Sequence, residues 1–146
     1  ALLVVLLVYG GGTAAIKLVR RRRPASMRGR LKLACALNAA ALEMARQAQR
    51  NGRHREVADH LYEAVARPVA TMEMVAHDRL TSRDVEQLLT AAGIAEQQKG
   101  QIRRWLEEFE AVRYGQAPPV VLNDFQEIEV LVRALLEQLA LRKRTR

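Results

Sequence analysis

The sequence predicts an all-α protein, in which one N-terminal transmembrane helix is followed by an antiparallel bundle of about five helices. The 146 residues are 49% hydrophobic but only 4% aromatic, a composition typical of helices that pack through small side chains. Apolar residues recur every three or four positions, and no segment shows the strict alternation of a strand. A chain of this length accommodates one modest domain and an appendage, so a multi-domain enzyme is not expected.

Residues 1–23 are expected to form a transmembrane anchor with a basic cytoplasmic flank. The apolar run extends to residue 19 with a single charge, and this length is sufficient for a helix to cross about 30 Å of hydrocarbon. Basic side chains that follow such a helix remain in the cytoplasm and contact anionic lipid headgroups. The predicted membrane-interface residues are Lys17, Arg20, Arg21, Arg22 and Arg23. The chain is therefore expected to cross the membrane once, with its C-terminal domain in the cytoplasm.

Three consecutive glycines, Gly10 to Gly12, lie inside the apolar run. They either introduce a kink or permit the close approach of a neighbouring transmembrane helix. A cleaved signal peptide fits this segment less well, because its charges normally precede the apolar region.

The net charge of +8 and the pI near 10.5 resemble those of a nucleic-acid-binding protein. The charge is unevenly distributed, however: residues 1–30 carry +7, residues 142–146 carry +4, and the remaining residues, 31–141, carry −3. No interleaved aromatic residues and no nucleic-acid-binding motif accompany the basic runs. We therefore expect no nucleic-acid partner. The basic tail, 142–146, is interpreted either as a solvated helix end or as a second contact with lipid or an acidic partner.

Residues 24–141 are expected to form the cytoplasmic helical bundle, which opens with a helix over 26–50. Asn51 and Gly52 supply a left-handed cap at its end. Two neighbouring apolar stripes predict that this helix is contacted on two sides and lies centrally in the bundle. The stripes comprise Leu31, Cys35, Asn38, Leu42 and Ala45, and Leu33, Leu37, Ala40 and Met44.

A second helix is expected over about 53–76. Pro68 lies in its interior, where proline removes a backbone hydrogen bond, so the segment is expected to kink or to divide into two shorter helices. Thr81 and Asp84 then form a capping box at the start of a short helix that Gly93 closes.

Two further helices complete the predicted bundle. The first covers 95–114, with Trp105 and Phe109 one turn apart as its expected core anchors. Gly115 ends it, and Asn123 caps a last helix that extends through Leu141.

No catalytic constellation accompanies these helices, so the chain is not expected to be an enzyme or to hold a cofactor. Cys35 is the only cysteine and lies on a predicted buried stripe, where packing is the expected role. Glu56, His60 and Glu63 have the spacing of a metal-binding helix. The chain supplies no second Glu-x-x-His unit, so these residues are interpreted as a solvated face and not as a metal site.

Residues 80–115 read LTSRDVEQLLTAAGIAEQQKGQIRRWLEEFEAVRYG, a segment that resembles the cytoplasmic C-terminal region of Bat-type aerotolerance membrane proteins. It is also similar to the helical domain attached to bacterial transglutaminase-like membrane proteins, which shares an Ala-Arg-Tyr-Gly-like ending; here a valine precedes the arginine. Residues 59–64 resemble the helix that opens this region. The resemblance implies a bacterial inner-membrane protein with a cytoplasmic helical domain. It also implies von Willebrand A-domain proteins and a MoxR-type ATPase as partners.

Arg113 and Tyr114, within this ending, are the candidate partner-docking residues. The structural alternative is that Tyr114 packs its ring on the bundle while Arg113 reaches terminal carbonyls or Glu110. The predicted function is a non-enzymatic, membrane-anchored scaffold or interaction module in an envelope or stress-related complex. The alternative is an accessory subunit of a larger membrane complex, held through its transmembrane helix and the glycine run.

Overall fold

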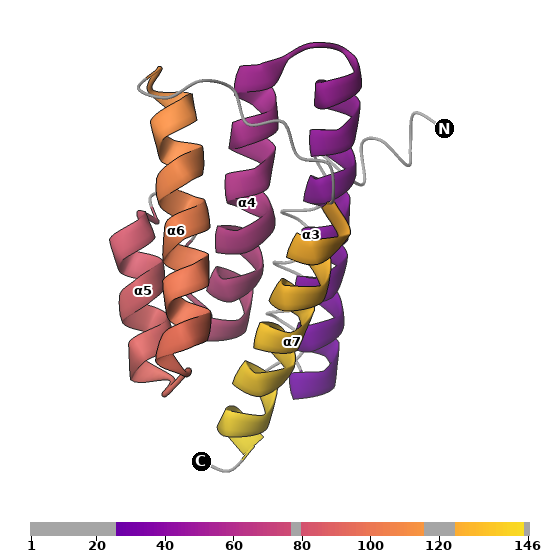
Figure 1. Ribbon diagram of the computed structural model, residues 1–146. Coiled ribbons are helices and arrows are strands. Elements are labelled where there is room, and N and C mark those ends of the chain that lie inside the picture. The colour runs from indigo at the N-terminus through magenta and orange to yellow at the C-terminus, as the bar shows by residue number, and fades with distance from the viewer. Residues whose placement is uncertain (1–25, 77–79, 116–124, 145–146) are drawn as a thin grey trace.

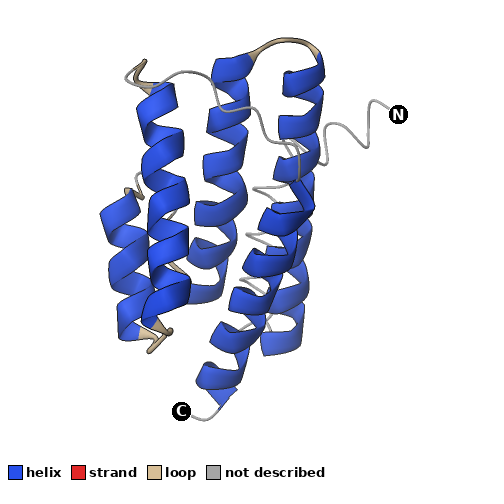
Figure 2. Cartoon of the chain, viewed as in Figure 1, coloured by secondary structure: helices blue, strands red, loops and turns tan. Residues whose placement is uncertain are grey.

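The computed structural model describes residues 26–76, 80–115 and 125–144, and within these ranges the chain is entirely helical, with five helices and no strand (Figures 1 and 2). The prediction of an all-α bundle is thereby confirmed. The helices are α3 (Met27–Arg50), α4 (His54–Glu73), α5 (Ser82–Ala91), α6 (Glu96–Arg113) and α7 (Phe125–Arg144). The predicted anchor, residues 1–23, lies outside the described residues.

Helix α4 occupies the centre of the bundle, because it contacts each of the other four helices. Helices α3 and α7 pack against it and against each other, while α5 and α6 form a second pair that also packs on α4 (Figure 1). The expectation that the 26–50 helix is central is wrong, although α3 is contacted on two sides as predicted. Alanines explain the difference: Ala58, Ala64, Ala66 and Ala70 are buried between the larger apolar residues of α4, so neighbouring helices approach it from several sides.

Local sequence signals determine where the helices begin and end. The Ser26 hydroxyl accepts a hydrogen bond from the Gly29 N–H at 3.1 Å, and Gly52 adopts the expected left-handed conformation with φ 71°. The capping box is formed: the Asp84 N–H donates to Thr81 Oγ1 at 3.2 Å, and the Thr81 N–H donates to Asp84 Oδ2 at 2.9 Å. Helices α3 and α5 therefore begin where cap chemistry predicts, whereas α4 and α6 begin without a side-chain cap.

The core lies along both sides of α4, and its largest fully buried side chains come from every helix of the bundle. Phe109 is 1% exposed, whereas Trp105 is only partly buried against the same core. The prediction that both aromatic residues anchor the bundle is thus confirmed for Phe109 alone. The other large members of the core include Leu42, Leu61, Met72, Leu89, Ile102, Leu106, Ile128, Leu135, Leu136 and Leu139.

A single side-chain hydrogen bond compensates for the proline inside α4. Pro68 has no N–H, so it cannot donate to the carbonyl of Ala64, four residues earlier. Asn38 of α3, which is 2% exposed, donates to this carbonyl from Nδ2 at 2.7 Å. Helix α4 continues through Pro68 without a break. The expected division into two shorter helices is therefore wrong, because a partner from another helix satisfies the carbonyl that the proline leaves without a donor.

The bundle has two ends that carry different residues. The end that we call basal comprises the first turn of α3, the last turns of α4 and α7, and the α5–α6 turn. At this end the Arg142 guanidinium packs against Gly93 of the α5–α6 turn. The contact is so close that a Cβ atom on residue 93 would be 2.6 Å from Arg142 NH1. The opposite, distal end comprises the α3–α4 turn, the last turn of α6 and the start of α7, where Arg46 lies over the Phe125 ring at 5.4 Å. Helix α7 extends to Arg144, so the first three residues of the predicted basic tail continue the helix.

We expect Asn38→Ala to lower the free energy of unfolding by about 2 kcal/mol, because it leaves the buried Ala64 carbonyl without a donor. In a Pro68→Ala background, residue 68 regains an N–H that can serve this carbonyl, so the same substitution costs about 1 kcal/mol less. Chemical denaturation of the four proteins, followed by Trp105 fluorescence, measures both costs. Equal costs in the two backgrounds would contradict the assigned role of Asn38.

Acid sensitivity is expected at the start of α5. The hydrogen bond from the Thr81 backbone is the main cause that lowers the pKa of Asp84 below its ordinary value of 3.8. The carboxylate therefore contributes stability above that ordinary value, and the contribution is lost as the pH falls through the lower pKa of the folded state. Wild-type and Asp84→Asn proteins should differ in unfolding free energy at neutral pH and converge below pH 3.8. A difference that is constant with pH would refute this role.

Candidate functional site

The two predicted docking residues lie at the distal end, where α6 stops beside the first turns of α4. Arg113 is the last residue of α6 and Tyr114 is its C-cap. The Nε atom of Arg113 lies 2.7 Å from Oδ1 of Asp59 in α4. The alternative in which Arg113 pairs with Glu110 is wrong, because Asp59 provides the carboxylate that it contacts.

The Arg113 guanidinium also lies close to two aromatic rings. It is 5.0 Å from the centroid of the Tyr62 ring and 6.0 Å from that of Tyr114, both within the range of favourable cation–π contact. The ion pair and the two rings together restrict a side chain that is otherwise among the most flexible in proteins. Arg113 is therefore an ordered cation at the surface, with 34% of its side chain exposed.

Tyr114 presents its ring to solvent and is 71% exposed. The expectation that this ring packs on the bundle is wrong, and the helical period explains why. Tyr114 follows the buried Phe109 by five residues, which places it about 140° around the helix axis from the core-facing side. Gly115 then takes a left-handed conformation with φ 70° and redirects the chain. The result is an exposed aromatic residue at a fixed point beside Arg113.

A partly buried polar cluster surrounds the hydroxyl of Tyr62, whose ring Arg113 contacts. The Tyr62 hydroxyl donates to the Leu80 carbonyl at 2.7 Å and lies 3.1 Å from Oε1 of Glu110. This same carboxylate oxygen accepts a hydrogen bond from the Ser82 N–H, at the first turn of α5, over 3.2 Å. The pKa of Tyr62 lies far above its ordinary value, mainly because the hydroxyl is buried and secondly because the negative charge of Glu110 is close. Tyr62 therefore remains a hydrogen-bond donor at physiological pH and connects α4, α5 and α6.

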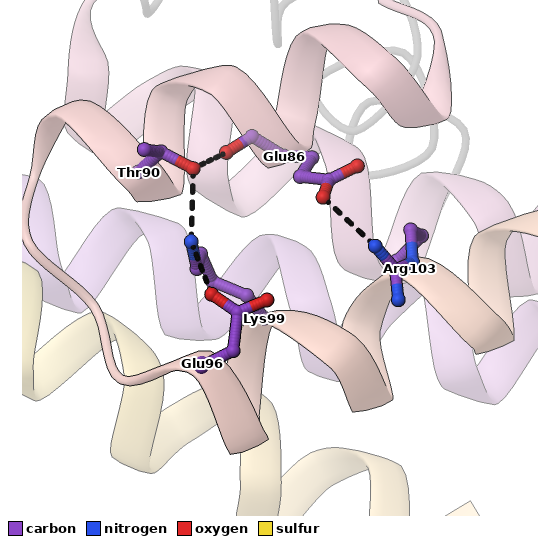
Figure 3. A network of polar contacts seen from close by, with 5 residues as sticks. All are labelled: Glu86, Thr90, Glu96, Lys99 and Arg103. Carbon is purple, nitrogen blue, oxygen red and sulfur yellow. Dashed lines mark hydrogen bonds and ion pairs between the residues drawn. The ribbon is translucent and has the colours of Figure 1, made fainter.

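Helices α5 and α6 are further connected by a network that sequence reasoning missed (Figure 3). Arg103 NH1 lies 3.0 Å from Oε1 of Glu86, and Lys99 Nζ lies 3.1 Å from Thr90 Oγ1 and 2.8 Å from Oε2 of Glu96. The Lys99 side chain is only 12% exposed. The hydrogen bond that Lys99 donates to Glu96 is the main reason why the pKa of Glu96 lies below its ordinary value. These contacts fix the α5–α6 pair.

The residues with metal-binding spacing do not assemble into a site. Glu56 is exposed, and Arg53 NH1 lies 3.6 Å from its Oε2. Among the described residues, no three histidine, cysteine or acidic side chains come together as metal ligands. Cys35 is partly buried and packs against the core.

None of the helices in the described ranges is long and apolar enough to span a membrane. The five predicted membrane-interface residues, Lys17 and Arg20 to Arg23, lie outside these ranges and remain predictions. Comparisons with family models, with curated proteins and with solved structures found no match. The surface that contains Arg113 and Tyr114 places an ordered cation beside an exposed aromatic ring.

We expect Tyr62→Phe to lower the free energy of unfolding by about 1 kcal/mol, because it removes the hydroxyl that donates to the Leu80 carbonyl. Tyr114→Ala should change it by less than about 0.5 kcal/mol, because the ring is mostly in solvent. Chemical denaturation of both variants checks this contrast. A larger cost for Tyr114→Ala would mean that this residue maintains the fold and is not available for binding.

Proposed function

We propose that the chain is a non-enzymatic, membrane-anchored interaction module, whose helical bundle binds partner proteins through Arg113 and Tyr114. The observation that carries this proposal is the exposure of Tyr114 next to an arginine that Asp59 and Tyr62 hold in place. Tyrosine and arginine are the residues that most often dominate the energy of protein–protein interfaces. An arginine that is already ordered loses less entropy when a partner binds.

The anchoring half of the proposal rests on residues 1–23. Their apolar run and the four arginines that follow it are the pattern of a single-pass helix whose C-terminal flank is cytoplasmic. The proposed location is the bacterial inner membrane, with the bundle in the cytoplasm. Alkaline carbonate extraction and protease protection test this location: the chain should stay with the membrane, and the bundle should be digested only from the cytoplasmic side.

The proposed partners are cytoplasmic or membrane proteins of an envelope or stress-related complex. The resemblance of residues 80–115 to Bat-type proteins favours von Willebrand A-domain proteins and a MoxR-type ATPase. The net charge of −3 on residues 31–141 favours a protein partner over nucleic acid, because nucleic-acid-binding domains carry a basic excess over the folded body.

Site-specific photocrosslinking in the intact cell tests the docking surface. A photoreactive residue placed at Tyr114 should give a discrete crosslinked species, and Arg113→Ala should reduce its yield by about tenfold, the effect of losing about 1.4 kcal/mol of binding energy. The same photoreactive residue at Glu107, which is also exposed on α6, serves as the matched control. Equal crosslinking at the two positions, or a yield that does not depend on Arg113, would count against this surface.

A further inference from the structure

We propose that the basal end of the bundle is a membrane-contact face, which binds anionic lipid headgroups through Arg28, Lys32 and Arg142 and inserts Met74 and Leu141 among them. The inference deepens the proposed function and rests on the anchor that it assigns to residues 1–23. It also decides between the two interpretations of the basic C-terminal segment, in favour of lipid contact.

The fold brings basic residues from the first described helix and from the last one to the basal end. Helix α3 starts at the basal end with Arg28 and Lys32, which are both exposed and lie one turn apart on one face. Helix α7 runs in the opposite direction and finishes at the same end (Figure 1). There the exposed Arg142 extends over the α5–α6 turn at Gly93. Arg28, Lys32 and Arg142 thus lie at the same end of the bundle.

Acidic side chains offset this charge only in part. Glu96, at the start of α6, is paired with Lys99 at 2.8 Å, and Glu73, in the last turn of α4, is half-buried. Within the described residues, neither Arg28 nor Lys32 forms an ion pair with a carboxylate. The face therefore carries the sign of charge that an anionic leaflet attracts.

Exposed apolar side chains accompany the charges. Met74, which directly follows α4, is 54% exposed, and Leu141, in the last turn of α7, is 62% exposed. Both residues lie at the basal end. Met74 also adopts a left-handed conformation, with φ 58°, which is unfavourable for a residue with a side chain. A surface that combines exposed apolar side chains with arginine and lysine is typical of the headgroup region of a membrane.

The short connection to the proposed anchor favours lipid as the occupant of this face. Arg23 precedes Met27 by four residues, a distance of at most about 14 Å for a fully extended chain. If Arg23 is at the headgroups, the first turn of α3 lies within that distance of them. The 24 residues of α3 extend for about 36 Å. With the basal end on the headgroups, the distal end, and with it Tyr114, lies away from the bilayer.

Spin labelling of the full chain in vesicles tests the orientation. In a Cys35→Ala background, a nitroxide is attached at Met74→Cys or, as the control, at Tyr114→Cys. In vesicles that contain about 30% phosphatidylglycerol, the label at 74 should be accessible to oxygen and protected from a water-soluble nickel complex, and the label at 114 should show the reverse. In pure phosphatidylcholine vesicles the label at 74 should become accessible to the nickel complex.

Charge reversal identifies the side chains responsible. The triple variant Arg28→Glu, Lys32→Glu, Arg142→Glu should reduce the ratio of protected to exposed label at 74 by about tenfold or more, because each basic residue near an anionic surface contributes about fivefold to binding. The variant Arg50→Glu, Arg53→Glu, Arg55→Glu changes the charge equally at the distal end and should leave the ratio unaltered. Circular dichroism confirms that both variants remain helical.

Alkaline carbonate extraction of the same vesicles separates the two proposals. A chain that stays in the membrane, with the label at 74 exposed to the nickel complex in anionic vesicles, overturns the membrane-contact face and leaves the anchor intact. Protection that is equal in phosphatidylcholine, or that survives the basal charge reversal, also overturns it. A chain that is extracted by carbonate overturns the proposed anchor, and the contact face with it.

Discussion

The hydrogen bond from Asn38 to the Ala64 carbonyl is the interaction on which the arrangement of the bundle depends. Pro68 deprives that carbonyl of its usual donor in the middle of α4, the one helix that contacts all the others. Without an outside donor, a carbonyl buried there would carry the full cost of desolvation. The bond also fixes the register between α3 and α4, because a buried amide finds its partner in only one alignment of the two helices.

The sequence predicts those parts of the fold that depend on near neighbours. Caps at Ser26, Thr81 and Gly52 act over three or four residues, and apolar spacing locates the helices. The centrality of α4 was missed because a stripe of large residues is a poor guide to burial where alanines also face neighbouring helices. The effect of Pro68 was missed because its compensation comes from Asn38, thirty positions earlier in the sequence, and local patterns carry no information at that range.

The candidate site divides in the same way. The exposed position of Tyr114 follows from the helical period counted from Phe109, a signal that the sequence contains. The pairing of Arg113 with Asp59 joins residues 54 positions apart, and only the packing of α6 on α4 brings them together. Asp59 and Tyr62 do lie three residues apart on one face of α4. The sequence of α4 therefore predicts that these two side chains are neighbours, but it does not predict that Arg113 contacts them.

The division of the bundle into two pairs of helices around α4 has a consequence for its dynamics. Because α5 and α6 pack on α4 and on each other, an opening of this pair would leave the contacts among α3, α4 and α7 in place. Such an opening would pull Glu110 and Arg113 away from Tyr62 and Asp59, so the distal surface would lose its geometry before the bundle loses its fold. Amide hydrogen exchange in α5 and α6 would then be faster than in α3, and a partner that holds Arg113 in place would slow it.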